Sequence, residues 1–281
     1  MARGWQAGVA AISLGNVAGA KLPPGHPSTL NFKPETPPVY APFVALELSI
    51  IVPVYNEADN ILPLAREVAG VLSLPPTDYE LVFVDDASTD STWQKILEAH
   101  QLDARIRGLR HARNGGQSAA IWTGIQATRS PVIATLDGDL QNDPADLPRL
   151  LAGLAQADFV SGMRRARQDN FVRRASSAVA RWARRCILKV DFRDSGCAMR
   201  VFKRSALDGV FAFDGLHRFL PILVHGNGSR TLEIPVNHRP RAAGVSKYGV
   251  WNRLGRGVYD LFAIWWYQKR RLRPVPFTEL K

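Results

Sequence analysis

The sequence predicts an α/β fold, built on a mostly parallel sheet flanked by helices. Two observations support this prediction. From Leu48 onward, short apolar runs rich in β-branched residues alternate with helix-like stretches, and this alternation is typical of βαβ units. Several of the runs are apolar with hardly an interruption, as expected for strands that are buried on both faces of a parallel sheet.

The predicted strands are short and are each followed by polar or turn-forming residues. Leu48–Pro53 and Leu81–Val84 have the most continuous apolar character, so we place them in the centre of the sheet. Further runs of this kind follow them in chain order. The predicted strands are 48–53, 81–84, 106–111, 132–136 and 159–161.

The predicted helices lie between these strands. In the first of them, apolar residues recur at Ile61, Leu64, Val68 and Val71, which is the spacing of one helix face. Candidate N-cap residues, Ser88 to Asp90, precede the second helix. The predicted helices are 61–72, 91–99, 116–128 and 146–155.

Three regions follow from composition. Residues 1–45 are rich in proline, which prevents regular helix or sheet formation, so we expect a poorly ordered extension. Residues 46–240 contain the alternating pattern and form the expected α/β domain. Residues 241–281 contain a Gly/Ser-containing loop, an amphipathic helix and a basic tail.

Charge and cysteine content limit the possible partners and compartments. The formal net charge of +11 favours anionic partners, such as phosphorylated substrates, anionic lipid or nucleic acid. The two cysteines, Cys186 and Cys197, form neither a disulfide framework nor a zinc motif. A reducing compartment is therefore expected. No apolar stretch is long enough for a transmembrane helix.

Acidic residues follow three of the predicted strands. They are Glu57, the pair Asp85 and Asp86, and the pair Asp137 and Asp139. Because ligands bind beyond the carboxyl ends of parallel strands, these groups should meet at one edge of the sheet. Asp137 and Asp139 can face one Mg²⁺ or Mn²⁺ ion, since both cations prefer oxygen ligands. Glu57 and one of the Asp85–Asp86 pair can accept hydrogen bonds from a nucleobase or ribose, while simple turn and cap roles remain open.

Four ordered motifs resemble family 2 glycosyltransferases of the GT-A, Rossmann-like fold. They are 48–57 (LSIIVPVYNE), 83–90 (FVDDASTD), 114–120 (NGGQSAA) and 136–144 (LDGDLQNDP). The resemblance implies an inverting enzyme that uses a nucleotide-diphosphate sugar, such as a UDP- or GDP-sugar, and Mg²⁺ or Mn²⁺. It implies metal binding by Asp137, Asp139 and Gln141. The implied donor-binding residues are Pro53, Tyr55, Glu57, Asp85, Asp86 and Gln141.

The second half of the chain resembles polyprenyl-phosphate glycosyltransferases, a group that includes dolichyl-phosphate mannosyltransferases. The resemblance rests on 194–200 (DSGCAMR), 217–221 (HRFLP) and 238–248 (HRPRAAGVSKY). It implies an undecaprenyl- or dolichyl-phosphate acceptor and a role in cell-envelope glycan or glycolipid synthesis.

Lys and Arg far outnumber acidic residues between Arg164 and Arg204. Guanidinium groups match phosphate oxygens, so we expect an acceptor-phosphate site here, with Arg164 also acting in catalysis. Lys247, in the Gly/Ser-rich loop Gly244–Gly249, is expected to close over the donor diphosphate, although it is also interpretable as a surface lysine. His217 either contacts phosphate or only packs. The expected acceptor-phosphate residues are Arg164, Arg165, Arg173, Arg174, Ser195 and Arg218.

A phosphate acceptor is largely ionised at neutral pH and needs no general base. A hydroxyl acceptor needs a carboxylate base, for which Asp194 is the best spare candidate. Transfer to a sugar hydroxyl in polysaccharide synthesis is therefore the alternative reading. A nucleotidyltransferase is disfavoured because no Gly-rich phosphate loop follows the first strand. A nucleic-acid-binding protein is disfavoured because no recognised module is present.

The stretch from Val250 to Tyr267 has helical spacing of apolar residues, and Trp265 and Trp266 lead into the basic residues 269–271. This combination favours a helix in a membrane interface, although a helix packed on the core or on a partner subunit has similar features. We therefore expect a peripheral protein at the cytoplasmic face of a membrane. A homo-oligomer or a membrane-protein partner is possible, and no nucleic acid is expected.

Overall fold

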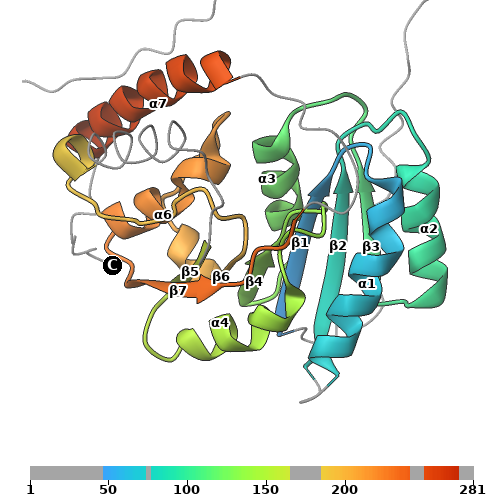
Figure 1. Ribbon diagram of the computed structural model, residues 1–281. Coiled ribbons are helices and arrows are strands. Elements are labelled where there is room, and N and C mark those ends of the chain that lie inside the picture. Colours follow the sequence, from blue (N-terminus) through green and yellow to red (C-terminus); the bar gives the residue numbers. More distant parts are fainter. Residues whose placement is uncertain (1–46, 74–76, 165–184, 241–249, 272–281) are drawn as a thin grey trace, which may run out of the picture. The chain divides into compact units, whose positions relative to one another are not determined.

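The computed structural model describes residues 47–73, 77–164, 185–240 and 250–271. Within them, a seven-stranded sheet has the order β3-β2-β1-β4-β6-β5-β7 (Figure 1). Pairing is parallel except at β6, which runs antiparallel to β4 and β5. The predicted mostly parallel sheet is confirmed. The strands are β1 (Leu48–Val54), β2 (Tyr79–Asp85), β3 (Ile106–Arg110), β4 (Val132–Thr135), β5 (Phe159–Arg164), β6 (Arg200–Lys203) and β7 (Thr231–Val236).

Helices cover both faces of the sheet. Two short 3₁₀ helices, Pro144–Asp146 and Arg204–Leu207, supplement the α-helices. In Figure 1, α1 and α2 lie on one side of β1 and β2, and α3 lies on the other side. The α-helices are α1 (Ala58–Leu72), α2 (Thr92–Leu102), α3 (Gln117–Ala127), α4 (Leu147–Gly153), α6 (Leu216–Gly226) and α7 (Val250–Arg270).

Neighbouring residues of the central strands point into different core layers. Ile50 and Val52 of β1 pack in the layer that contains α1, α2 and α4. Ile51 packs in the layer that contains α3, α6 and α7. All three side chains are fully buried. This two-sided burial explains why β1 reads as a nearly continuous apolar run.

Three elements of the second half were not predicted from the sequence. Strand β6 has four residues, two of them basic, so it lacks a clear apolar pattern. Helix α6 contains Pro221, a residue that normally argues against a helix interior. Strand β7 contains Glu233 and Pro235, which are both depleted in strands. Strand pairing across the sheet outweighs these local preferences in β6 and β7, and burial of apolar side chains in the core does so in α6.

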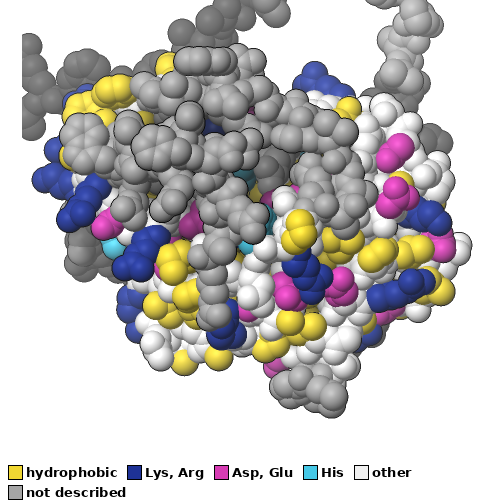
Figure 2. Space-filling model, in the orientation of Figure 1, with side chains coloured by type: hydrophobic (Ala, Val, Ile, Leu, Met, Phe, Trp, Pro, Cys, Tyr) yellow, Lys and Arg dark blue, Asp and Glu magenta, His cyan; other side chains and the backbone are white. Residues whose placement is uncertain are grey.

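The predicted C-terminal helix is present as α7. It buries Leu261 and Ile264 in the core, and Tyr267 donates a hydrogen bond of 3.1 Å from its hydroxyl to the carbonyl of Gly209. Several large apolar side chains remain exposed on its other side, and Figure 2 shows hydrophobic side chains there, at upper left. They are Tyr259, Phe262, Trp265 and Trp266. Apolar spacing over Val250 to Tyr267 predicted the helix, and of these apolar residues Phe262 and Trp265 do not face the core.

Two findings concern the domain organisation. All the described residues belong to one compact unit. The predicted proline-rich extension, residues 1–45, lies outside the described residues. Among the helices that are described, none combines the length and the apolar character needed to cross a bilayer.

Candidate active site

The carboxyl ends of β2, β1 and β4 lie side by side. β1 pairs with both other strands in parallel, with Val54 opposite Asp85 and Ile51 opposite Thr135. The polar residues that follow these strands therefore share one edge of the sheet, as the sequence predicted. This edge is the candidate active site.

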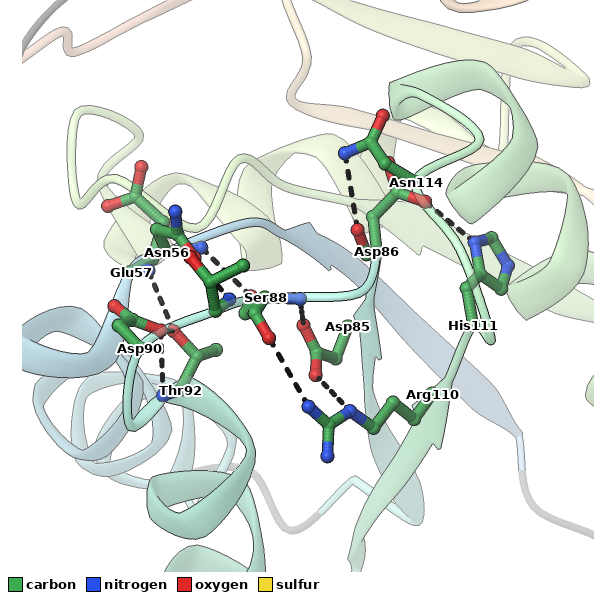
Figure 3. A network of polar contacts seen from close by, with 11 residues as sticks. Asn56, Glu57, Asp85, Asp86, Ser88, Asp90, Thr92, Arg110, His111 and Asn114 are labelled. Atoms are coloured by element: carbon green, nitrogen blue, oxygen red, sulfur yellow. Dashed lines mark hydrogen bonds and ion pairs between the residues drawn. The ribbon is translucent and has the colours of Figure 1, made fainter.

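The turns after β1 and β2 are bound to each other (Figure 3). The backbone N–H of Asn56 donates to the hydroxyl of Ser88 at 2.9 Å, and the side-chain oxygen of Asn56 accepts from the N–H of Thr89 at 2.8 Å. The N–H of Glu57 donates to the hydroxyl of Thr92 at 2.9 Å. Glu57 is also the N-cap position of α1, and its carboxylate accepts from the amide of Asn60. These bonds fix Glu57 beside the edge.

Non-glycine residues with positive φ lie after each of the three strands. Asn56 has a φ of 54°, Ala87 of 60° and Leu140 of 59°. Such a conformation costs an L-residue about 1–2 kcal/mol, and the surrounding hydrogen bonds must hold it in place. Strained backbone of this kind concentrates at functional sites. The three positions therefore mark the same edge that the carboxylates mark.

Asp85 is fully buried and contacts protein groups on both oxygens. One oxygen accepts from the backbone N–H of Ser88 at 2.9 Å, and the other lies 3.1 Å from Nε of Arg110. That second oxygen makes no bond of good hydrogen-bond geometry within the described residues. Figure 3 shows Arg110 reaching from β3 toward Asp85. Asp85 is thus ion-paired yet keeps capacity for another donor.

Asp86 holds the turn that leads into α3. Its two oxygens accept from the N–H groups of Gly115 and Gly116 at 2.8 and 2.7 Å, and Nδ1 of His111 lies 2.7 Å from one of them. Because a carboxylate only accepts, His111 donates here, and its Nε2 faces the hydroxyl of Thr123 at 2.9 Å. One of the residues Asp85 and Asp86 was expected to bind the donor and the other to stabilise the turn. Asp86 makes the contacts that stabilise the turn.

Asp137 and Asp139 stand at the end of β4. Asp137 accepts from the side-chain amide of Gln117 at 2.8 Å, and its N–H donates to the side chain of Asn142. Asp139 is 7% exposed and accepts from the N–H of Gln141 at 3.2 Å. Both carboxylates are therefore oriented by neighbours on the same edge. Gln117 belongs to the motif 114–120, but no role was predicted for it from the sequence.

Gly138 separates the two aspartates because no larger residue fits there. A Cβ at this position would lie 2.6 Å from Cγ1 of Val54 and 3.3 Å from the carbonyl oxygen of Pro53. Real Cβ atoms do not approach so closely, so the turn would have to move away from β1. The glycine between the two aspartates thus lets the turn pack closely against the central strand β1.

The predicted ligand set is chemically suited to Mg²⁺ or Mn²⁺. The side-chain nitrogen of Gln141 faces the carbonyl of Arg239 at 3.4 Å, which leaves its amide oxygen as the group to offer a cation. Two carboxylates and one amide oxygen form an all-oxygen set, as these hard cations prefer. The described residues contain no cluster of three or more His, Cys, Asp or Glu side chains suited to a metal. Substrate oxygens would have to complete the shell.

Arg239 anchors the loop that follows β4. Its guanidinium lies 2.8 Å from Glu67 of α1 and 2.7 Å from Asp143. Its backbone N–H donates to the carbonyl of Gln141 at 2.9 Å. The loop after β4 is therefore held between α1 and the end of β7.

Arg164 and Asp194 form a bidentate ion pair. Nε and Nη2 of Arg164 lie 2.6 and 2.7 Å from the two oxygens of Asp194. Burial lowers the pKa of Arg164, but the bonds and charge of Asp194 outweigh it and raise that pKa. The interpretation of Asp194 as a spare acid is wrong, because both its oxygens bind Arg164. The binding of acceptor phosphate by Arg164 stays a prediction.

Arg200 is a charged residue for which no role was predicted from the sequence. It is 1% exposed, and its Nη2 donates to the carbonyl of Ser195 at 3.0 Å, while Nε has no hydrogen-bond partner among the described residues. Burial lowers its pKa, while the charges of Cys197, Asp137 and Asp194 act in the opposite direction. A buried cation thus lies close enough to the candidate site for its charge and that of Asp137 to act on each other.

Two more predicted positions lie near the start of α6. The guanidinium of Arg218 is 3.9 Å from the carboxylate of Asp260 on α7. His217 binds the hydroxyl of Ser118 at the start of α3. The predicted site residues Arg165, Arg173, Arg174 and Lys247 lie outside the described residues.

Comparison with known families and proteins gives concordant results. A family model described as glycosyl transferase family 2 matches residues 49–211. The chain is 38% identical over 244 residues to a dodecaprenyl-phosphate galacturonate synthase of Rhizobium johnstonii, covering 84% of this chain and 71% of that protein. It is 38% identical over 216 residues to an undecaprenyl-phosphate 4-deoxy-4-formamido-L-arabinose transferase of Pseudomonas fluorescens. That match covers 76% of this chain but only 63% of the relative, which is less than two thirds of its length.

Solved structures share the fold. A mannosyltransferase from Pyrobaculum calidifontis, in complex with GDP-Man and Mn²⁺, gives a TM-score of 0.59 at 20% identity, covering 82% of this chain and 67% of that one. A glucosyl-3-phosphoglycerate synthase from Mycobacterium tuberculosis, in complex with Mn²⁺, UDP and phosphoglyceric acid, gives 0.59 at 15% identity, covering 81% and 80%. At these identities the likeness concerns the fold.

Proposed function

Because the chain belongs to glycosyl transferase family 2, we propose that it is an inverting enzyme that moves a hexose from a nucleotide-diphosphate sugar to a polyprenyl phosphate. The observation that supports this most strongly is the similarity to a dodecaprenyl-phosphate galacturonate synthase over 84% of the chain. The carboxylates at the carboxyl edge of β2, β1 and β4 also lie where a parallel sheet binds its ligands, which supports a site for this reaction there.

The nucleotide part of the donor binds at the turns after β1 and β2. Pro53 is the next-to-last residue of β1, and Tyr55 and Glu57 follow the strand. Asp85 offers a buried carboxylate oxygen that can accept from a base N–H. Asp86 supports this group through the turn at Gly115 and Gly116. The strained turn at Asn56 keeps these residues in place, so little reorganisation is needed when the donor binds.

The diphosphate part binds at the end of β4, where Asp137, Asp139 and Gln141 would hold Mg²⁺ or Mn²⁺. When bound, the cation supplies positive charge to the leaving diphosphate. Gln117 and Asn142 keep Asp137 in place through its carboxylate and its N–H. Lys247 is assigned to the same diphosphate, as the sequence resemblance implies.

The acceptor is an ionised phosphate and not a hydroxyl. A hydroxyl would need a carboxylate to remove its proton, and Asp194 is bound at both oxygens by Arg164. A phosphate has its second pKa near about 6 and is already nucleophilic at neutral pH. Catalysis then requires mainly positioning and charge stabilisation. The acceptor-phosphate residues are those of the basic segment, Arg164, Arg165, Arg173 and Arg174, together with Ser195 and Arg218.

A lipid acceptor requires contact with a membrane surface, and α7 is the proposed contact. Its exposed aromatic residues are followed by Lys269 and Arg270. Aromatic rings settle at the level of lipid headgroups, and basic side chains attract anionic lipid. We assign the protein to the cytoplasmic face, where nucleotide sugars are made, with a homo-oligomer or a membrane-protein partner as further possibilities.

The test is a transfer assay with purified protein, Mn²⁺ or Mg²⁺, radiolabelled UDP- and GDP-sugars, and undecaprenyl phosphate in detergent. Label that moves into the organic phase, and no longer does so with EDTA, is the expected result and identifies the donor. Donor hydrolysis without labelled lipid would instead favour the alternative, transfer to a sugar hydroxyl. No use of any donor would contradict the proposal.

A further inference from the structure

The hydroxyl of Ser118 binds three groups at the start of α6. Ser118 is the second residue of α3 and is 5% exposed. Its oxygen accepts from the backbone N–H of Gly215 at 3.1 Å and from that of His217 at 3.4 Å. It also lies 2.7 Å from Nδ1 of His217. One serine side chain thus joins α3 to the imidazole of His217.

These contacts determine which ring nitrogen carries the proton. A hydroxyl oxygen has two acceptor positions and one hydrogen. The two backbone N–H groups occupy the acceptor positions, so the hydrogen of Ser118 points to Nδ1 of His217. Nδ1 must then be an acceptor without a proton. The imidazole is therefore in the tautomer that carries its hydrogen on Nε2.

The surroundings keep this imidazole neutral. Burial lowers the pKa of His217 to about 3, and the charges of Arg218 and Arg200 act in the same direction. At neutral pH the ring is therefore uncharged, and Nε2 presents a fixed N–H donor. No acceptor for this N–H lies among the described residues. The buried Nε atoms of Arg200 and Arg218 also have no acceptor there.

His217 belongs to the same edge as the metal-binding carboxylates. Gln117, the neighbour of Ser118, donates to Asp137, so the first turn of α3 positions both Asp137 and His217. The charge of Arg200 acts on both of these residues. N–H donors that lack an acceptor, beside two guanidinium groups, suit an anionic oxygen.

We propose that Ser118 fixes His217 as a neutral donor whose Nε2–H binds a phosphate oxygen of the substrate. The inference rests on the proposed function, because both substrates of that reaction contain phosphate. Ser118 is a positioning residue, since it acts through the imidazole. A neutral donor recognises the phosphate without adding another full charge, and it transfers no proton during the reaction.

The first test is nuclear magnetic resonance on protein with ¹⁵N-labelled histidine. The expected spectrum shows His217 with a proton on Nε2 and none on Nδ1 at neutral pH. Ser118→Ala should mix the two tautomers. Thr231→Ala is the matched control, because it removes a hydroxyl that lies 3.1 Å from Nδ1 of His225 at the other end of α6. A proton on Nδ1 of His217 in the wild type would overturn the inference.

Two probes distinguish the sources of the phosphate. Farnesyl phosphate represents the acceptor, and UDP or GDP with Mg²⁺ represents the donor. A shift of the Nε2 resonance with farnesyl phosphate assigns His217 to the acceptor, and a shift with the nucleotide assigns it to the donor. No shift with any of these probes contradicts the proposal. The spectra are interpretable whether or not sugar is transferred, so failure of the proposed function is recognised separately.

Kinetics supply the second test. Because a hydrogen bond to a charged group is lost, His217→Leu should weaken kcat/KM roughly ten- to hundredfold. His217→Gln retains an amide N–H near the position of Nε2 and should recover much of this loss. Ser118→Ala should affect the same KM as His217→Leu does, whereas Thr231→Ala should not. Equal activity of His217→Leu and the wild type would show that the imidazole only packs.

Discussion

Arg164, the last residue of β5, forms a bidentate ion pair with Asp194, which lies thirty positions further along the chain. The backbone N–H of Asp194 donates in turn to the carboxylate of Glu233 in β7. The side chains of Arg164 and Asp194 are 14% and 11% exposed. Because the pair is largely withdrawn from water, each charge depends on the other for compensation. The pair therefore joins the end of β5 to the segment before β6, and Glu233 ties that segment to the middle of β7.

Arg164→Ala should lower stability substantially, because it leaves the carboxylate of Asp194 buried without its partner. The expected loss of unfolding free energy is about 3 kcal/mol. Removing both charges in Arg164→Ala/Asp194→Ala should restore part of it. Arg230→Ala serves as the control, since it breaks an exposed pair with Asp158. Urea unfolding measures all four proteins, and an equal effect of Arg164→Ala and Arg230→Ala would contradict the argument.

Arg164→Lys tests the acceptor role while a positive charge remains beside Asp194. A lysine keeps the positive charge but loses the bidentate geometry. The acceptor KM should rise far more than the donor KM, as expected if this arginine contacts the acceptor phosphate. Steady-state kinetics with each substrate varied in turn provide the measurement. The reverse pattern would move Arg164 to the donor site.

Asp139→Ala should abolish turnover and leave the fold intact, because Asp139 is one of the two carboxylates proposed to hold the metal. Electron paramagnetic resonance of Mn²⁺ in the presence of UDP or GDP should show weaker metal binding. Asp191→Ala is the control, since Asp191 is an exposed acid outside the site. Full activity of Asp139→Ala would contradict the proposal that Asp139 binds the metal.

Gly138→Ala should impair both stability and turnover, because its Cβ would lie 2.6 Å from Cγ1 of Val54. Overpacking of this kind costs about 1–3 kcal/mol. Adding Val54→Ala removes the clashing methyl group and should recover part of the stability. Gly70→Ala is the control, because nothing lies within 4 Å of its would-be Cβ. Thermal unfolding of these variants tests the close packing of the turn against β1.

The first half of the fold was predictable because its strands are buried on both faces. The sequences of β1, β2 and β4 are apolar runs because both faces of these strands are buried. Since the carboxyl ends of parallel strands meet at one edge of the sheet, Asp85 and Asp137 are then expected at the same edge. The second half gives no such signal. Strand β6 is antiparallel and ends in basic residues, and α6 includes Pro221. Their places depend on pairing partners that are distant in the sequence.

The contacts within the site were less predictable than its location. Arg164 was predicted to bind phosphate from local charge, and this role stays a prediction. Its pairing with Asp194 depends on how β5 and the segment before β6 meet. Arg200 carried a weak signal, as a charged residue at the start of a short apolar run. Ser118 resembled an ordinary residue of a helix N-terminus, and only its contact with His217 reveals its proposed role.

His217 should make stability depend on pH. Its pKa is about 3 in the folded protein and about 6.5 when unfolded, so the unfolded chain binds more protons between these values. Stability should therefore rise with pH in this window. The contribution is complete above about pH 6.5 and is lost as the pH falls toward 3. Urea unfolding across this range should show a smaller slope for His217→Gln, with His225→Gln as the control for removing an imidazole from α6.

The exposed face of α7 should bind anionic membranes. Replacing Trp265 and Trp266 by Ala should release the protein from liposomes that contain phosphatidylglycerol, because these rings provide apolar area beside Lys269 and Arg270. Removing Tyr259 and Phe262, which are 77% and 55% exposed, should have a similar effect. Leu102→Ala is the matched control, since it removes a side chain that is 69% exposed at the end of α2. Sedimentation with liposomes measures binding, and higher salt should weaken it because screening shortens the range of the basic charges. If the wild type never sediments with these liposomes, α7 is not the membrane contact. In that case its aromatic face is better explained by packing on a partner subunit.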